Sequence, residues 1–267
     1  MPLLEIITHD KTDPEVAGLA FKVGNKQGKT VITVKDVPGF YVNRCLGPFM
    51  AECTGLLQEG VDPLTLDRTM KEFGYPVGPI TLADEVGLDV AMHVNEFLAK
   101  HLGDRMLGAD IGALRAMVDA GFLGRKSGKG FFTYEAVTGK FKKSDKGKEY
   151  SKETIQNRMC ARFVKEAILC LQDEIIRNPV DGDIGAVFGV GFPPFRGGPF
   201  RYADQEGIQV TLLGLTPCFS APAVTKFPCA QTLCDRMSRY ADEHGPQFTP
   251  PPLLVDMAKS GKKFHNE

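Results

Sequence analysis

Two polar side chains lie in or beside apolar segments, and both are of types that active sites use, a carboxylate and an amide. Glu5 lies within the apolar run Leu3–Thr8, and Asn43 follows Pro38-Gly39 in the segment PGFYVNR. A carboxylate among apolar residues is costly to bury unless it is paired, and a natural partner is a histidine that it orients. Asn43 can present its amide to a ligand at a domain junction. The alternatives are that Glu5 faces solvent and that Asn43 bonds to local backbone.

The elements that position these two residues follow from the same pattern. Leu3–Thr8 and residues 29–35 are β-rich and predict two strands, and Asp13-Pro14 is a good start for a helix that runs to about Lys26. Two strands and one helix do not form a stable sheet alone. Residues 1–36 are therefore predicted to be the tail end of a larger α/β domain.

After Pro38-Gly39 the apolar residues recur at three and four, which predicts helices. The first covers about 40–59 and contains Pro48, which should kink it. Asp62-Pro63 opens a second helix that ends near Phe73. Further helical segments are expected at 82–86, 89–102 and 111–120.

Composition narrows the class of protein. The chain has 267 residues, a formal net charge of -1 and seven cysteines without a CxxC pair. This charge gives no bulk attraction for nucleic acid, and buried thiols in a reducing compartment fit better than a disulfide framework. Cys45, Cys53, Cys160 and Cys170 are expected on apolar helix faces. The N-terminus resembles neither a signal nor a transit peptide, no segment predicts a membrane span, and no metal-ligand pattern is present.

Two segments are predicted to be irregular. Residues 121–134 (GFLGRKSGKGFFTY) are basic and glycine-rich, but their spacing fails the Walker pattern, so a surface loop is favoured over a phosphate site. Residues 135–152 carry many lysines and few apolar residues, which is typical of a solvated linker.

The sequence after this linker repeats the sequence before it. The pattern G-P-x-x-x-A-D-x-x-G occurs at Gly78 and again at Gly198, and Arg44 and Glu52 are spaced as Arg158 and Glu166 are. Two irregular copies suggest a duplicated helical domain whose halves bury each other's apolar faces. The Arg/Glu residues are predicted to form weak salt bridges along each helix. The shared aspartates Asp84 and Asp204 are predicted to cap helices.

These motifs resemble the 3-hydroxyacyl-CoA dehydrogenase family. The resemblance lies in VKDVPGFYVNR (34–44), GYPVGP (74–79), DEVGLD (84–89) and the loop 121–134. Residues 182–204 resemble the C-terminal copy of multifunctional β-oxidation enzymes. Over nearly the whole chain, the resemblance is strongest to the mitochondrial trifunctional enzyme alpha subunit. The implied fold is mainly α: two helical dehydrogenase C-terminal-type domains, 37–134 and 153–267, joined by the linker 135–152. They follow a Rossmann-type remnant, 1–36.

The resemblance also implies a function. The family oxidises 3-hydroxyacyl-CoA to 3-ketoacyl-CoA with NAD, using a histidine that takes the hydroxyl proton. Glu5 matches the glutamate that orients this histidine, and Asn43 matches the asparagine that contacts the substrate. The expected partners are acyl-CoA and a thiolase-type beta subunit, and the expected location is the mitochondrion.

The sequence also lacks several motifs that the family uses for catalysis and for binding NAD. The catalytic histidine, the catalytic serine and the G-x-G-x-x-G fingerprint that binds NAD do not occur, and His9 is in the wrong place for the histidine. We therefore expect the chain to be inactive alone. Residues 211–234 carry three prolines and are expected to be an insertion, with the helix resuming at Asp235. The alternative hypothesis is a non-catalytic helical module for dimerisation or assembly of a β-oxidation complex.

Overall fold

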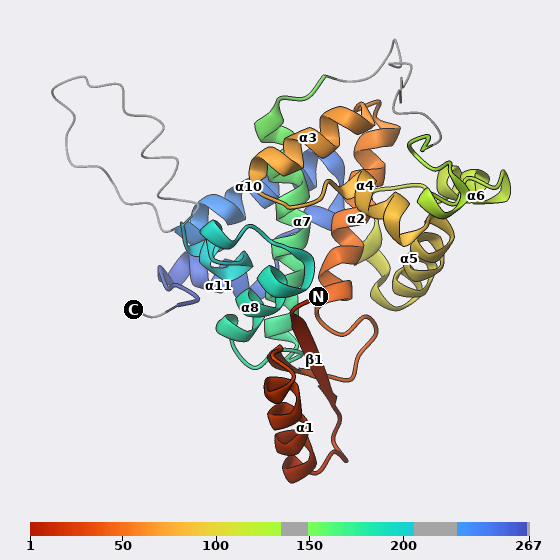
Figure 1. Cartoon of the computed structure of the whole chain (residues 1–267). Coiled ribbons are helices and arrows are strands. Elements are labelled where there is room, and N and C mark those ends of the chain that lie inside the picture. Colours follow the sequence, from red (N-terminus) through yellow and green to blue (C-terminus); the bar gives the residue numbers. More distant parts are fainter. Residues whose placement is uncertain (135–148, 206–228, 266–267) are drawn as a thin grey trace, which may run out of the picture. The chain divides into compact units, whose positions relative to one another are not determined.

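The computed structural model describes residues 1–134, 149–205 and 229–265 (Figure 1). The chain forms two compact units. The first comprises Met1–Cys45 with Phe163–Glu267, and the second comprises Leu46–Arg162. Two helices, α2 (Val42–Gln58) and α7 (Lys152–Gln172), contribute residues to both units. The predicted linker and insertion fall largely on residues 135–148 and 206–228, which lie outside the described residues.

The first unit begins with a β-α-β motif: β1 (Leu3–Thr8), α1 (Pro14–Lys26) and β2 (Thr30–Lys35). The two strands pair in parallel, with Leu3 opposite Thr30. Asp13 caps α1 as predicted, because its side chain accepts the N–H of Glu15 at 2.8 Å. Gly24 lets α1 lie close to the sheet, since a Cβ there would be 2.7 Å from Val31. The sequence therefore predicted this motif correctly.

The rest of the first unit is helical. A glycine-rich helix, α8 (Pro179–Val190), packs against both strands. A Cβ on Gly185 would lie 2.8 Å from Ile32, and one on Gly189 would lie 2.8 Å from Leu3, so only glycine permits this approach. The remaining elements are η3 (Pro194–Arg196), helical residues 199–205, α10 (Cys229–His244), η4 (Pro246–Phe248) and α11 (Pro252–Ser260).

The second unit contains residues 46–58 of α2 together with several shorter helices. They are α3 (Pro63–Phe73), α4 (Pro79–Val86), α5 (Leu88–Leu102), η1 (Gly103–Met106), α6 (Gly112–Asp119) and η2 (Arg125–Ser127). Asp62 caps α3 through the N–H of Thr65 at 2.9 Å, as the sequence predicted. Part of the core is a cluster of Ala51, Leu98, Leu102 and Met106.

The predicted salt bridges within each helix are wrong. Arg44 Nε donates to Glu166 Oε1 at 2.9 Å in the first unit, and Arg158 Nε donates to Glu52 Oε1 at 2.7 Å in the second. Residues eight apart in a helix are separated by about 12 Å along its axis, too far to pair. Each pair therefore joins α2 to α7.

The predicted capping role of Asp84 and Asp204 is also wrong. Asp84 lies near the end of α4 and accepts the N–H groups of Phe131 and Phe132, both at 2.9 Å. Asp204 accepts the N–H groups of Phe264 and His265, both at 2.9 Å. Each carboxylate thus anchors a distant segment to its helix, and charge-assisted bonds of this kind are strong.

The predicted restart of the last long helix at Asp235 was too late. The helix α10 begins at Cys229 because Ala230, Leu233 and Met237 already form a buried face at helical spacing. The end of the expected insertion, residues 229–234, is therefore helical.

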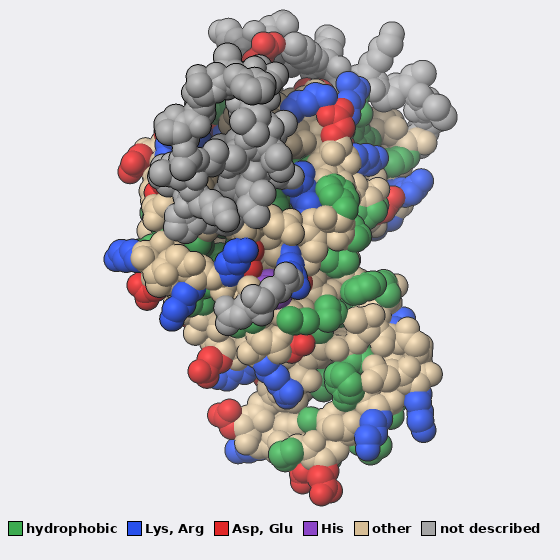
Figure 2. All heavy atoms as spheres, turned by 90° about the vertical axis from the view of Figure 1, so that its left-hand side faces the viewer, with side chains coloured by type: hydrophobic (Ala, Val, Ile, Leu, Met, Phe, Trp, Pro, Cys, Tyr) green, Lys and Arg blue, Asp and Glu red, His purple; other side chains and the backbone are tan. Residues whose placement is uncertain are grey.

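Four further observations concern surface charge, the cysteines, membrane-spanning helices and metal sites. Basic and acidic side chains are interspersed over the face in Figure 2, in line with the near-zero net charge. Cys45, Cys53, Cys160 and Cys170 are buried thiols outside any disulfide of the described residues, as predicted. Among the described residues, no helix has the length and apolar character needed to cross a membrane. The same residues hold no group of His, Cys, Asp and Glu that is suited to a metal ion.

Candidate functional site

The site is built where β1 meets the start of α2. Glu5 Oε1 accepts the N–H of Tyr41 at 3.1 Å and that of Val42 at 3.2 Å. The first N–H groups of a helix have no partner within the helix. Glu5 therefore caps α2 from a distant strand, and this contact explains why a carboxylate is tolerated inside an apolar run.

A strained turn brings these N–H groups to Glu5. Gly39 has φ 78° and Phe40 has φ 50°, so two successive residues adopt the left-handed region before α2 begins. Glycine accepts this conformation readily, but phenylalanine does so at a cost. The Nη1 atom of Arg44 donates to the carbonyl of Pro38 at 3.2 Å and holds the turn from the other side.

The environment of Glu5 has opposing effects on its charge. Burial raises the pKa of the Glu5 carboxyl above its usual value, while the N–H groups of Val42 and Tyr41 favour the charged form. The positive end of the α2 dipole acts in the same direction as these bonds. Within the described part of the chain only Oε1 is engaged, so Oε2 can accept a further hydrogen bond.

Tyr41 is a supporting residue that the sequence analysis did not single out. Its side chain is fully buried, and its hydroxyl donates to the carbonyl of Gly182 at 3.0 Å. Its ring lies against Gly185. Tyr41 therefore ties the turn that Glu5 caps to α8. The only sequence signal was an aromatic residue beside the turn, which is too common to identify this role.

Asn43 lies in the first turn of α2, directly after the two residues that Glu5 binds. Its side chain is exposed, and no described residue forms a hydrogen bond with it. The local-backbone alternative therefore has no support from the geometry. An exposed amide beside a capped helix start is available to a ligand, and its role as a substrate contact stays a prediction.

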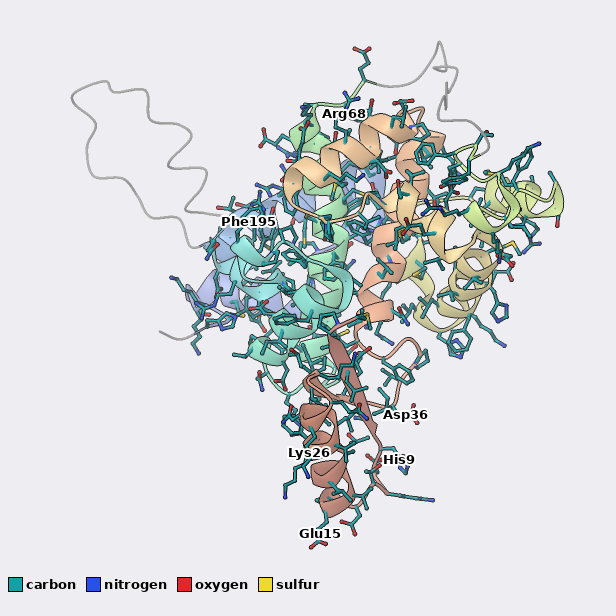
Figure 3. The ribbon with its side chains drawn as sticks, in the orientation of Figure 1. His9, Glu15, Lys26, Asp36, Arg68 and Phe195 are labelled. Carbon is teal, nitrogen blue, oxygen red and sulfur yellow. The ribbon has the colours of Figure 1, made fainter. Side chains whose placement is uncertain are left out.

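A dinucleotide-binding α/β domain carries its glycine-rich turn after its first strand, and residues 1–36 are predicted to be only the end of such a domain. The turn between β1 and α1, residues 9–12, contains no glycine, and the Asp13 carboxylate occupies the N-terminus of α1. A second negative charge at this helix end would be repelled. His9 lies on this turn (Figure 3), is exposed, and accepts the N–H of Lys11 on Nδ1 at 3.1 Å. These residues do not fit NAD.

Comparisons with known proteins show which proteins this chain is similar to. Residues 39–134 match the family model of the 3-hydroxyacyl-CoA dehydrogenase C-terminal domain. The chain is 41% identical over 274 residues to the fatty acid oxidation complex subunit alpha of Idiomarina loihiensis, with 99% of this chain and 35% of that protein covered. The corresponding proteins of Shewanella loihica and Vibrio vulnificus are each 40% identical. The chain thus spans about a third of the length of these relatives.

Two solved structures share the fold. The 3-hydroxybutyryl-CoA dehydrogenase of Escherichia coli aligns with 98% of this chain and 68% of its own, with a TM-score of 0.74 and 20% identity. The dehydrogenase part of multifunctional enzyme 1 from C. elegans aligns with 96% of this chain and 56% of its own, with a TM-score of 0.62 and 22% identity. They confirm the mainly helical fold with its small parallel sheet.

The expected mitochondrial location is wrong. The three fatty acid oxidation complex subunits named above come from bacteria, which have no mitochondria. The expectation failed because the family motifs are shared between the bacterial and the mitochondrial enzymes, so the motifs alone carry no information on compartment.

Proposed function

We propose that this chain forms the helical, substrate-side part of an NAD-dependent 3-hydroxyacyl-CoA dehydrogenase of fatty-acid β-oxidation. The observation that carries this proposal is the Glu5 carboxylate, held by two N–H groups of α2 through one oxygen and open at the other. The family match of residues 39–134 and the names of the bacterial relatives support the same reaction class.

In this proposal Glu5 is a positioning residue that acts through a histidine. The bonds to Tyr41 and Val42 fix the carboxylate, so that Oε2 can accept the N–H of an imidazole. The negative charge raises the basicity of the opposite imidazole nitrogen, which removes the proton from the 3-hydroxyl group. This chain supplies the orienting carboxylate, and the histidine comes from outside the motifs present here.

Asn43 is proposed to contact the reacting end of the acyl-CoA. Its amide N–H₂ group can donate to an oxygen on which negative charge develops as the hydroxyl becomes a carbonyl. Because Asn43 follows the capped start of α2, its backbone is held by the same contacts that hold Glu5. Both residues therefore belong to one preorganised segment.

NAD is the hydride acceptor that the family resemblance implies, and this chain's own β1–α1 turn does not fit it. We therefore expect purified residues 1–267 to consume no NADH with acetoacetyl-CoA, as followed by loss of NADH absorbance. Turnover above the buffer rate would contradict the proposal that the catalytic histidine and the NAD site are not supplied by this chain. His9 would then be the first base to examine.

A second candidate function, assembly, is favoured by the buried Arg/Glu pairs. Each predicted copy, 37–134 and 153–267, gives one arginine and one glutamate to the other. If the copies act as the two halves of an internal dimer, the purified chain should be monomeric by light scattering. A stable homodimer would contradict this internal pairing of the two copies. The relatives are named as subunits of a complex, so a thiolase-type partner subunit is included in this proposal.

A further inference from the structure

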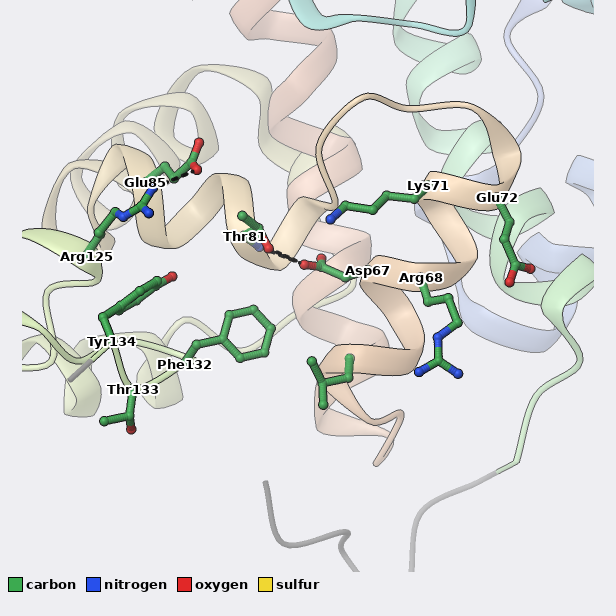
Figure 4. A pocket seen from close by; sticks show the side chains of 11 residues that line it. Asp67, Arg68, Lys71, Glu72, Thr81, Glu85, Arg125, Phe132, Thr133 and Tyr134 are labelled. Atoms are coloured by element: carbon green, nitrogen blue, oxygen red, sulfur yellow. Dashed lines mark hydrogen bonds and ion pairs between the residues drawn. The ribbon is translucent and has the colours of Figure 1, made fainter. Parts of the chain in front are cut away.

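A pocket of ≈ 780 Å³ opens in the second unit, away from Glu5 and Asn43 in the sequence (Figure 4). Its volume falls in the range of small-molecule sites. It is formed by α3, the start and end of α4, η2 and the segment that follows η2. The lining residues that the argument uses are Asp67, Arg68, Lys71, Phe132 and Tyr134.

The acidic side chains of this pocket are already satisfied. Asp67 accepts the N–H groups of Ile80 at 2.7 Å and Thr81 at 3.1 Å, and the Thr81 hydroxyl at 2.5 Å. The other two acids form ion pairs, Glu85 with Arg125 at 3.3 Å and Glu72 with Lys152 at 2.7 Å. Their negative charge is therefore largely offset by neighbours.

Two basic side chains of the same pocket have no such partner. Arg68 and Lys71 are exposed, lie one turn apart on α3, and form no ion pair with any residue that the structure describes. Both side chains line the pocket, whose acidic side chains are already paired or hydrogen-bonded. This arrangement favours an anionic ligand, and a guanidinium suits phosphate in particular because its donors match two phosphate oxygens.

The opposite wall is aromatic and held in place. The N–H of Phe132 and the hydroxyl of Tyr134 both donate to Asp84 Oδ2 at 2.9 Å. Asp84 itself is fully buried. Figure 4 shows the rings of Phe132 and Tyr134 on one side of Asp67 and Thr81, with Arg68 and Lys71 extending from the other. A fixed aromatic wall offers a surface on which a planar ring can stack.

The corresponding helix of the second predicted copy shows that the scaffold does not require these cations. Asp183 accepts the N–H of Phe200 at 2.8 Å, as Asp67 accepts that of Ile80. Counting from these aspartates, Ile184 and Val187 stand where Arg68 and Lys71 stand on α3. The same framework is thus built with apolar residues at both positions, and the basic pair is particular to the pocket.

We propose that this pocket binds a nucleotide, with its phosphate groups on Arg68 and Lys71 and its base against Phe132. The test is calorimetric titration of purified residues 1–267 with ADP, adenosine and inorganic phosphate in turn. ADP should bind at least roughly tenfold more tightly than either fragment, because it alone uses both walls.

Variants localise the binding. R68Q and K71Q should each weaken ADP by roughly tenfold, and F132L should weaken ADP without affecting phosphate. The matched control is K100Q, which removes an exposed charge of α5 outside the pocket and should change nothing. Arg68 and Lys71 are exposed, so circular dichroism melting curves should be unchanged.

Two outcomes would overturn the proposal. One is that ADP fails to bind at millimolar concentration, or binds equally to R68Q, K71Q and the unmodified chain. The other is that phosphate and ADP bind equally and F132L has no effect, which would leave a simple anion site and exclude a nucleotide.

Discussion

Arg44 Nε and Glu166 Oε1 lie 2.9 Å apart and join α2 to α7 within the first unit. The two side chains are only 9% and 2% exposed. Arg158 and Glu52 make the same contact, between the same atom types, in the second unit. Buried charges of this kind are expensive to remove from water and are stable only as pairs.

Replacing one partner of this pair should strongly destabilise the fold. In R44M the buried Glu166 carboxylate loses the Arg44 cation, so the free energy of unfolding should fall by about 3–5 kcal/mol. The Pro38 carbonyl also loses its bond to Arg44. Urea denaturation of the purified chain measures the loss.

An exposed ion pair serves as the control for this prediction. Arg115 and Glu96 pair on the surface, with side chains 56% and 40% exposed. Because exposed pairs contribute about 0–1 kcal/mol, R115M should have little effect. The double variant R44M/E166L should recover part of the loss, since the buried charge left by R44M is removed as well. Equal losses in R44M and R115M would contradict the argument.

Two glycines should respond in opposite ways to alanine. A Cβ on Gly185 would lie 2.8 Å from Ile32 and 2.9 Å from the Tyr41 ring, so G185A should cost about 1–3 kcal/mol by overpacking. Gly18 lies within α1 with nothing within 4 Å of its added Cβ. G18A should therefore stabilise by about 0.4–1 kcal/mol. Thermal melting of both variants shows whether each substitution stabilises or destabilises the fold. Stabilisation by G185A would show that α8 does not pack on the sheet as described.

The pair Asp183–His265 should make stability depend on pH. Nε2 of His265 lies 2.7 Å from Asp183 Oδ2, and both side chains are nearly buried. Burial, partly offset by the N–H of Phe200 and by His265, raises the pKa of Asp183 from 3.8 to about 6. The folded state therefore holds this proton more tightly than the unfolded state does.

The sign follows from this difference. The stabilising contribution is fully present below pH 3.8 and is lost as the pH rises through about 6. Relative to D183N, the unmodified chain should thus become less stable between these two values. Urea midpoints measured at several pH values for both proteins compare the two slopes, and parallel slopes would exclude titration of Asp183 as the cause.

Local signals in the sequence predicted much of the fold. Asp13 and Asp62 marked helix starts because capping depends only on neighbouring residues. The Arg44–Glu166 contact was missed because its partners lie on different helices, and spacing along one helix says nothing about a second. The anchoring role of Asp84 was missed for the same reason.

The catalytic roles of Glu5 and Asn43 stay predictions from the family resemblance. The structure adds that Glu5 caps α2, a contact between residues 36 positions apart in the chain. Tyr41 was missed because its role depends on Gly182 and Gly185 of α8. Such a contact depends on the tertiary fold and leaves no local pattern.

The central claim is that Glu5 orients a catalytic histidine. It is tested most directly in a chimera in which this chain replaces the matching segment of the Idiomarina loihiensis relative. The chimera should reduce acetoacetyl-CoA with NADH. E5Q should lower kcat by about 10- to 100-fold with little change in KM, and should lower the apparent pKa of the base in the pH–rate profile of 3-hydroxyacyl-CoA oxidation.

The variant keeps the size of the side chain, so a loss of folding is not expected, and circular dichroism confirms this. An active chimera whose E5Q variant retains full kcat and an unchanged pH profile would contradict the claim, as would a folded chimera without activity.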